Sequence, residues 1–482
     1  MIAAATAGHV LSHAGLLLDA LAAACALCLR GRGRRIASAA ALVLTPLLLG
    51  GALWKSHQML HLRHHPALAA AGIVAALVVV AALAWLFHRR PVLFALAAVV
   101  ALPFRFSLLS GGTGGVLLVL YAVIGGGALA LVIWGEAEDR AAAGALEWAL
   151  SGYVVLYAIQ ALYTPDLTKA VQQLGFFYVP FALLFVLLRG VSWDRRVISR
   201  CAGASVALAI LFAAIGIGEY AAGRLIFHVS LNSDQRYFRV NSLFYDPNIY
   251  GRYLALAMVL LTAWMLWQRG RREVAAAAGV LAFLWLGLLW SISQSSLVAL
   301  LAGLAVLAVL RFPWRLALGG AAVAVAAIVV IAAADSHRLH LNFSNNSTSG
   351  RASLVRQGVD LFGDRPFAGF GSGSFSCEFL RHTSSPGVSC GAAAIPGITS
   401  DSHTAPVTVA AEQGVLGLLA YLALLIAAVL ALARGPLRDN VVRAAILAAF
   451  VALVIHSWFY ADFLEDPITW TLLAVGAACS AI

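Results

Sequence analysis

Runs of apolar residues, separated by short polar connections, follow one another along almost the whole of this 482-residue chain. A helix needs about 20 mainly apolar residues to cross the hydrocarbon core of a bilayer, where every backbone polar group must be hydrogen-bonded within the protein. Hydrophobic residues make up 62% of the chain and charged residues only 11%, whereas a soluble domain carries about 25% charged residues. The sequence therefore predicts an all-α polytopic membrane protein.

About fifteen of these runs have spanning or nearly spanning length. They lie near 9–29, 36–53, 67–87, 91–103, 115–134, 144–163, 175–188, 201–222, 247–267, 274–290, 296–310, 316–334, 405–433, 441–459 and 467–482. Because the run near 91–103 and the last run are short enough to be re-entrant, we expect about 12 to 15 transmembrane helices. The expected organisation is transmembrane helices over 1–334, one large polar loop over 335–404 and C-terminal transmembrane helices over 405–482.

Lysine and arginine are distributed unevenly between the two sets of alternating loops. More than half of the 32 basic residues lie in short loops of one set, beginning with Arg30 to Arg35. An excess of this kind marks cytoplasmic loops, so the loops at 223–246 and 335–404, which belong to the other set, are predicted to lie outside the cytoplasm. The net charge of +11 is then explained by basic residues that set the orientation of the chain in the membrane. We expect no nucleic-acid partner, because no basic patch is interleaved with aromatic residues.

The segment from 335 to 421 is the longest polar interruption of the apolar pattern. It contains Gly350-Arg351, the glycine-rich run Arg365-Pro-Phe-Ala-Gly-Phe-Gly-Ser-Gly-Ser-Phe375, Ser402-His403 and Glu412-Gln-Gly-Val-Leu-Gly417. It also contains Cys377 and Cys390, and an extracytoplasmic position favours a disulfide between them. Closing a loop of this size stabilises a fold by about 3 kcal/mol.

Arginines in the two outer loops stand close to apolar runs, which suits an anionic ligand held in the membrane. Arginine makes paired, charge-assisted hydrogen bonds to phosphate and does not deprotonate. The candidates are Arg239, Arg252, Arg351 and Arg356. The alternative is that some of them pair only with lipid headgroups or with Asp360 and Asp364.

His403 is the natural candidate for a general base. It follows Asp401 and Ser402 and stands just before an apolar run, and a histidine can accept a proton near neutral pH. The chain has no Asp-rich metal motif. We therefore expect chemistry without a metal or other cofactor, in which arginines stabilise a diphosphate leaving group while a base takes a proton from an acceptor hydroxyl. Asp401 and Glu412 are the alternative bases.

The segment Arg239-Val-Asn-Ser-Leu-Phe-Tyr-Asp-Pro-Asn248, together with the motifs named above, resembles the O-antigen ligase and polymerase family over roughly residues 90–470. The resemblance implies a glycosyltransferase C-like membrane fold. It implies transfer of a glycan from an undecaprenyl-diphosphate carrier to a glycan or lipid-core acceptor at the outer face of the inner membrane. By the motif, His403 is the base, and Arg239 and Arg351 hold the diphosphate. Further candidate substrate contacts are Arg252, Arg356, Asn248, Asp246 and Glu412.

Local structure offers Asp246 a simpler role as well. An aspartate directly before Pro247 is a favourable N-cap, and proline fits the first turn of the helix that follows. We therefore expect Asp246 to cap this helix whether or not it also contacts substrate.

Two alternatives to a ligase remain. A polymerase for O-antigen, capsule or exopolysaccharide belongs to the same family, whereas a transporter or lipid flippase is a protein of another class. A transporter is expected to carry ionisable residues near the middle of the membrane. The candidates of this kind are scattered without evident pairing: Asp19, Glu147, Glu219 and His456. The gathering of polar motifs in the outer loops favours the enzyme.

Overall fold

The computed structural model describes residues 2–54, 56–105, 117–135, 142–227, 238–313, 315, 345–383, 390 and 401–479. Within these ranges the regular secondary structure is helical throughout, with no strand. This confirms the predicted all-α class. The predicted run near 316–334 lies outside the described residues.

Ten helical segments of the described chain are long and apolar enough to cross a membrane, as expected of a multi-pass membrane protein. They are α2 (Gly31–Ala52), α4 (Pro66–Arg89), α7 (Ala145–Gln160) with its final turn η1 (Ala161–Tyr163), the continuous segment α8 (Leu167–Gln173), η2 (Leu174–Tyr178) and α9 (Val179–Arg189), then α10 (Arg195–Ala222), α11 (Pro247–Trp267), α12 (Arg271–Ser291), α13 (Gln294–Arg311), α17 (Ala405–Ala433) and α18 (Val441–Phe459). Shorter apolar helices are α1 (Ile2–Cys28, apolar from Ser12), α5 (Val92–Ala101), α6 (Leu118–Trp134) and α19 (Pro467–Cys479).

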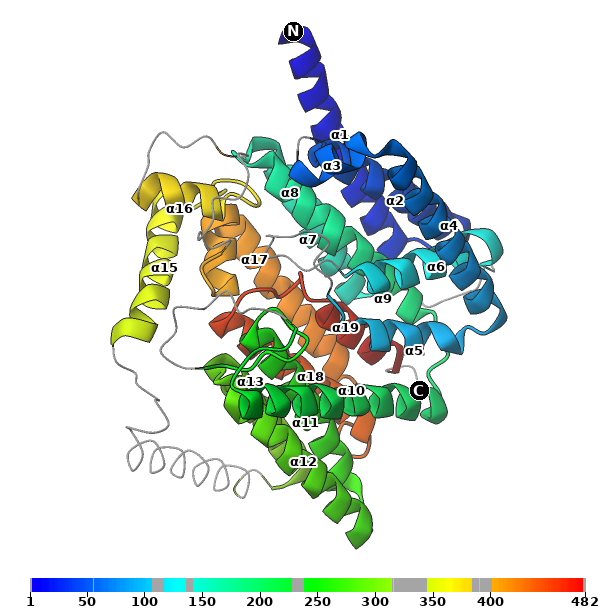
Figure 1. Ribbon diagram of the computed structural model, residues 1–482, viewed down its shortest axis with the longest axis vertical. Helices are drawn as coiled ribbons and strands as arrows, with labels where there is room; N and C mark the ends of the chain where they lie inside the picture. Colours follow the sequence, from blue (N-terminus) through cyan, green and yellow to red (C-terminus); the bar gives the residue numbers. More distant parts are fainter. Residues whose placement is uncertain are drawn as a thin grey trace.

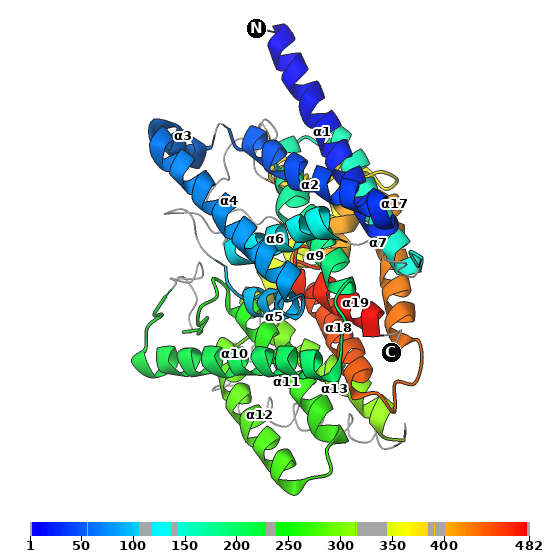
Figure 2. The ribbon, with the colours of Figure 1, turned by 90° about the vertical axis from the view of Figure 1, so that its right-hand side faces the viewer.

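Two buried apolar clusters hold these helices together. The larger is built mainly by the N-terminal helices up to α9 with α17 and α19, and the smaller by α10 to α13 with α18. In the larger cluster α17 packs on α7 and α19 on α9. Helix α18 packs on α11 and α13 of the smaller cluster and also on α17 and α19, so it joins the two clusters. Figure 1 shows the N-terminal helices above the green helices α10 to α13, and α10 lies across α12 there and in Figure 2.

Arginines of the loops predicted to be cytoplasmic bind the carbonyl ends of neighbouring helices. Arg35 donates to the carbonyl of Val132 (2.6 Å) near the end of α6, and Arg189 donates to that of Ala477 (2.7 Å) near the end of α19. A cation at a helix C-terminus satisfies carbonyls that have no partner within the helix and complements the helix dipole. The first contact links two loops of the arginine-rich set, and the second links such a loop to the end of α19.

The acidic residues that appeared scattered in the sequence have specific partners. Glu147 forms an ion pair with Arg189 (2.9 Å), and Asp19 accepts a hydrogen bond from Thr45 (3.0 Å). Glu219 accepts bonds from the backbone N–H groups of Asn241 and Ser242 at 3.1 and 2.8 Å. The expectation that these groups lack pairing was therefore wrong, because their partners come from distant parts of the chain.

The predicted large loop contains helices of its own. These are α15 (Asn345–Asp364) and α16 (Phe375–Thr383), and α15 packs on α17, as Figure 1 shows. The predicted disulfide joins Cys377 in α16 to Cys390, with the two Cα atoms 5.6 Å apart.

Candidate active site

Helix α17 is interrupted at Gly414, 11 residues after the predicted base His403, and the glycine-rich run packs against the interruption. Gly414 has a left-handed backbone (φ 64°, ψ −160°) inside α17, which breaks the regular hydrogen-bond ladder. Gly371 donates to the carbonyl of Glu412 (2.8 Å), and Val415 donates to that of Pro366 (2.7 Å). The backbone groups released by the break are thus satisfied by the run 366–375.

The glycines of the run 365–375 and of the motif 412–417 are explained by this close approach of the two backbones. Gly369 has φ 68°, and a Cβ atom there would stand 2.2 Å from the carbonyl oxygen of Glu412. The side chain of Glu412 is buried and accepts hydrogen bonds from the N–H groups of Gly373 (2.9 Å) and Phe375 (3.0 Å). Glu412 therefore holds the glycine-rich run in place, and a direct contact between Glu412 and substrate stays a prediction.

His403 stands directly before α17 in a left-handed backbone conformation (φ 54°). Its backbone N–H donates to Asp401 Oδ1 (2.7 Å), and its ring Nδ1 lies 3.4 Å from the same oxygen. The other contact of the ring is with Tyr460: the two rings are stacked with centroids 5.7 Å apart. The imidazole thus lies between a carboxylate and a phenol, although among the described residues its Nδ1 has no hydrogen-bond partner.

Tyr460 follows the end of α18 and links His403 to the outer segment that precedes α11. Its side chain is hydrogen-bonded to Asp246. Desolvation raises the pKa of Tyr460 well above its ordinary value, and the charges of Asp246 and Asp462 raise it further. The phenol therefore stays protonated, and its O–H donates a hydrogen bond to the carboxylate of Asp246. Asp246 also caps α11, as predicted, by accepting from the N–H of Asn248 (2.6 Å).

Arg239 lies in the same outer segment as Asp246, and its guanidinium is held by two acceptors. Its Nε donates to the carbonyl of Ser291 (2.9 Å), and its Nη2 donates to Asn248 Oδ1 (3.1 Å). Ser293, the N-cap of α13, donates to the same Asn248 oxygen (3.0 Å). Asn248 thus positions Arg239, and any contact of Asn248 with substrate stays a prediction.

A buried polar network continues from Asn248 to α18. Ser296 donates to the backbone carbonyl of Asn248 (3.2 Å), and the hydroxyls of Ser295 and Ser296 each lie 3.3 Å from His456 Nε2. The His456 ring in turn meets Tyr460 edge to face, with centroids 5.6 Å apart. His456, which seemed isolated in the sequence, therefore joins the Arg239 cluster to the His403 cluster.

The remaining predicted arginines are Arg252, Arg351 and Arg356. Arg252 is paired with Asp466 at 3.0 Å, and both side chains are only 2% exposed. Arg356 is exposed on α15. Arg351 also belongs to α15, but its side chain lies outside the described part of the structure. Further along the helix, Gly358 packs against Val407 at the beginning of α17.

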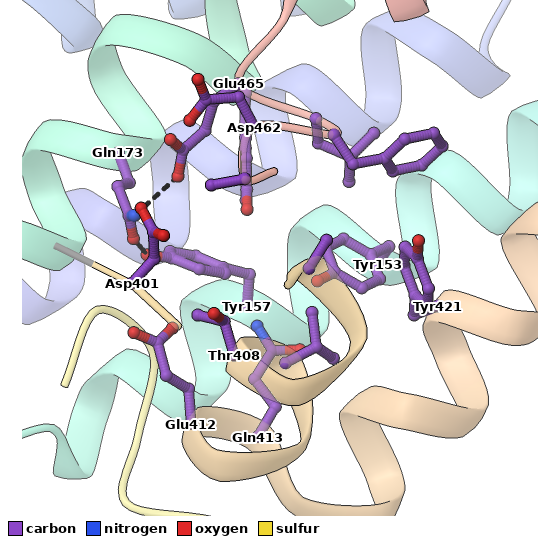
Figure 3. Close-up of a pocket in the computed structure, with 16 residues that line it drawn as sticks. Tyr153, Tyr157, Gln173, Asp401, Thr408, Glu412, Gln413, Tyr421, Asp462 and Glu465 are labelled. Atoms are coloured by element: carbon purple, nitrogen blue, oxygen red, sulfur yellow. Dashed lines mark hydrogen bonds between the residues drawn. The ribbon is translucent and has the colours of Figure 1, made fainter. Parts of the chain in front are cut away.

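A partly enclosed cavity of about 70 Å³ lies beside His403. Figure 3 shows Asp401, Glu412 and Glu465 along one wall and Tyr153 and Tyr421 on the opposite side. Gln173 donates to Glu465 Oε1 (2.7 Å). Desolvation, and next the charge of Asp462, raise the pKa of Glu465 above its ordinary value, whereas Lys169 lowers it.

Sequence reasoning missed most of the residues contributed by the C-terminal helices. Tyr460, Asp462 and Glu465 line or adjoin the site, yet none was selected. A usable signal was present, because the short connection Tyr460-Ala-Asp-Phe-Leu-Glu-Asp466 carries three carboxylates between two apolar runs.

Comparison with known proteins connects this architecture to one family. Residues 279–422 match the family model described as O-Antigen ligase. This region runs from within α12 to α17 and includes α15, the glycine-rich run and His403. No curated protein matches the chain. The match confirms, over residues 279–422, the resemblance to the O-antigen ligase family seen in the sequence.

Proposed function

We propose that the protein moves a glycan from undecaprenyl diphosphate to an acceptor hydroxyl, with His403 as the general base and inversion at the anomeric carbon. The family match supports a membrane glycan ligase or polymerase. The assignment of His403 as base and Arg239 as diphosphate ligand rests on one observation. Tyr460 contacts both the His403 ring and Asp246, and Asp246 lies in the same segment as Arg239. A proton acceptor and a cationic diphosphate ligand thus belong to one cluster.

Arg239 is the donor-binding residue in this scheme. Its bonds to Ser291 and Asn248 fix the plane of the guanidinium, and a fixed guanidinium gives directed, charge-assisted bonds to phosphate oxygens. Arg351, in the first part of α15, is the second proposed diphosphate ligand. Both cations stabilise the negative charge that develops on the leaving diphosphate.

The chemical step needs one base. The acceptor oxygen attacks the anomeric carbon and forms the new C–O bond, while the bond to the diphosphate oxygen breaks and its electron pair leaves with the diphosphate. His403 takes the hydroxyl proton. Asp401, 3.4 Å from Nδ1, orients the ring and stabilises the imidazolium that forms.

The site is proposed to face the extracytoplasmic side of the inner membrane. The uneven arginine distribution supports this orientation, and so does the contact between two of the arginine-rich loops. A cysteine introduced at the exposed position Asp364 should react with a membrane-impermeant thiol reagent in intact cells. Labelling only after lysis contradicts the orientation.

Purified protein incubated with undecaprenyl-diphosphate-linked glycan, with and without acceptor, tests the reaction class. Release of undecaprenyl diphosphate only when an acceptor is present supports transfer. Longer glycans formed from the donor alone identify a polymerase, and a glycan joined to lipid core identifies a ligase. Movement of intact donor across proteoliposome membranes without release of the diphosphate supports a flippase and contradicts the proposal.

A further inference from the structure

The cavity beside His403 has the wrong charge for a diphosphate. Asp401, Glu412, Asp462 and Glu465 all line it, and Lys169 is the cation that acts on this group. The ionised carboxylates among them repel a diphosphate strongly where water is largely excluded, and Glu465, whose pKa is raised, offers it no positive charge. The cavity is therefore suited to an uncharged or cationic ligand, and Arg239 is not among the residues that line it.

Gln413 and Tyr153 add uncharged polar groups to the lining of the cavity. Gln413 is 2% exposed, and Figure 3 shows its side chain between the acidic wall and Tyr153. Among the described residues its Oε1 has no hydrogen-bond partner, but this oxygen is fully buried and does not reach the cavity. The carboxyl groups are therefore the acceptors that a ligand in the cavity would meet.

Asp462 adds a strained backbone to the same wall. Its φ is 73°, a left-handed conformation that costs a non-glycine residue about 1–2 kcal/mol. Such strain is typical of binding and catalytic sites, where the surrounding structure maintains it. Glu412 already accepts two backbone bonds, so Asp462 and Glu465 are the carboxylates that a ligand would meet.

We infer that this cavity is the acceptor subsite and that Asp462 and Glu465 accept hydrogen bonds from the hydroxyls of an uncharged sugar residue. The inference rests on the proposed transfer function. Asp401 belongs both to the cavity wall and to the immediate contacts of His403, so a sugar held in the cavity has a hydroxyl next to the base. The volume of about 70 Å³ accommodates roughly five water molecules, which is the space of the polar edge of one sugar ring.

A divalent cation fits this arrangement less well. Within the described residues, the one group of three potential ligand atoms that lie within 4.8 Å of one another is Cys377, Glu378 and Cys390. The two cysteines of that group form the disulfide. The carboxylates of the cavity are more widely spaced, as hydrogen bonds to several hydroxyls of one ring require.

Saturation-transfer NMR on the purified protein tests the inference without requiring turnover. The probes are methyl glycosides of glucose, galactose, mannose, rhamnose and N-acetylglucosamine. At least one should bind the wild type, and Asp462→Asn should weaken it by about tenfold, the loss expected for one hydrogen bond to a charged group. Asparagine also tolerates the left-handed backbone, and Glu465→Gln provides a second variant with the same expected result.

A control variant locates the effect. Asp364→Asn removes an exposed carboxylate on α15 and should bind the same glycoside normally. Equal binding in Asp462→Asn, Glu465→Gln and wild type, or binding of none of the probes, overturns the inference.

Calorimetric titration with Mg²⁺ or Ca²⁺ tests the alternative that the cavity binds a divalent cation. Binding of either ion that is lost in Asp462→Asn makes the cavity a cation site and also overturns the inference. If the wild type binds glycosides but releases no undecaprenyl diphosphate, the proposed transfer fails while sugar binding stands, so the two failures can be distinguished.

Discussion

The imidazole of His403 lies nearly parallel to the phenol of Tyr460, with ring centroids 5.7 Å apart and an interplanar angle of 26°. The two residues flank one pair of helices: His403 precedes α17, and Tyr460 follows α18. The hydrogen bond from Tyr460 to Asp246 adds the beginning of α11. Three segments that are distant in the sequence thus meet at one side chain, and this meeting brings the proposed base into the cluster that holds Arg239.

Replacing Gly369 tests the contact between the glycine-rich run and α17. Gly369→Ala should destabilise this contact by at least about 1–2 kcal/mol from the left-handed backbone alone. The added Cβ would in addition stand 2.2 Å from the Glu412 carbonyl oxygen. We expect a lower unfolding temperature and loss of transfer.

Gly363→Ala is the matched control for this experiment. Gly363 lies in α15, and a Cβ atom there would meet nothing within 4 Å. Alanine in a helix is favoured over glycine by about 0.5–1 kcal/mol, so stability and transfer should stay at or above wild-type values. Equal behaviour of the two variants contradicts the account of the glycine-rich run.

The ion pair between Arg252 and Asp466 is expected to support the fold. Both side chains are 2% exposed, and removing one partner of a buried pair costs about 3–5 kcal/mol because the other charge remains buried. Arg252→Met should therefore unfold at a clearly lower temperature, and the double variant Arg252→Met/Asp466→Leu should recover much of the loss. Normal stability with weakened donor binding in Arg252→Met would instead support the substrate contact suggested by the sequence.

The fold class followed from apolar run length, because the bilayer imposes a length on every spanning helix. The run predicted at 405–433 coincides with α17 (Ala405–Ala433). The helices α15 and α16 were not predicted, since their composition is polar and their stability comes from packing on α17 and from the disulfide. The sequence also gave no indication that α17 opens at Gly414, which depends on backbone contacts with residues 366–371.

The sequence predicted only those site residues that lie in recognisable local motifs. His403 and Arg239 were selected from their neighbours in the sequence, and the structure brings their clusters together through Tyr460 and His456. Glu465 was missed because its importance depends on tertiary burial. A carboxylate in a short connection looks like an ordinary solvated charge until the helices around it are packed.

Arg239→Lys tests whether diphosphate binding needs the shape of the guanidinium. Lysine keeps the charge but cannot reproduce the two bonds to Ser291 and Asn248 or a planar grip on phosphate. We expect loss of most transfer activity with a stable fold. Arg381→Lys, at a partly exposed ion pair with Glu378, should transfer normally, and near-normal turnover in Arg239→Lys would show that a diffuse positive field is sufficient.

The raised pKa of Glu465 predicts a pH-dependent stability. The folded protein keeps a proton on Glu465 at pH values above the ordinary pKa of 4.5, at which the unfolded chain has released it. This contribution is fully present below 4.5 and declines as the pH rises from there through the raised pKa. Thermal unfolding from about pH 5 to about pH 9 should show a shallower decline for Glu465→Gln than for the wild type. Identical slopes would contradict the burial of this carboxyl.

Transfer by His403→Ala tests the central claim most directly. Purified wild type, His403→Ala and the control His382→Ala, which removes a half-exposed histidine on α16, are compared for acceptor-dependent release of undecaprenyl diphosphate. Loss of the general base should lower the rate of His403→Ala by about 10²- to 10⁴-fold, with donor binding and unfolding temperature retained. His382→Ala should match the wild type. Retention of more than about a tenth of wild-type transfer by His403→Ala, a loss too small for general-base catalysis, would contradict the assignment.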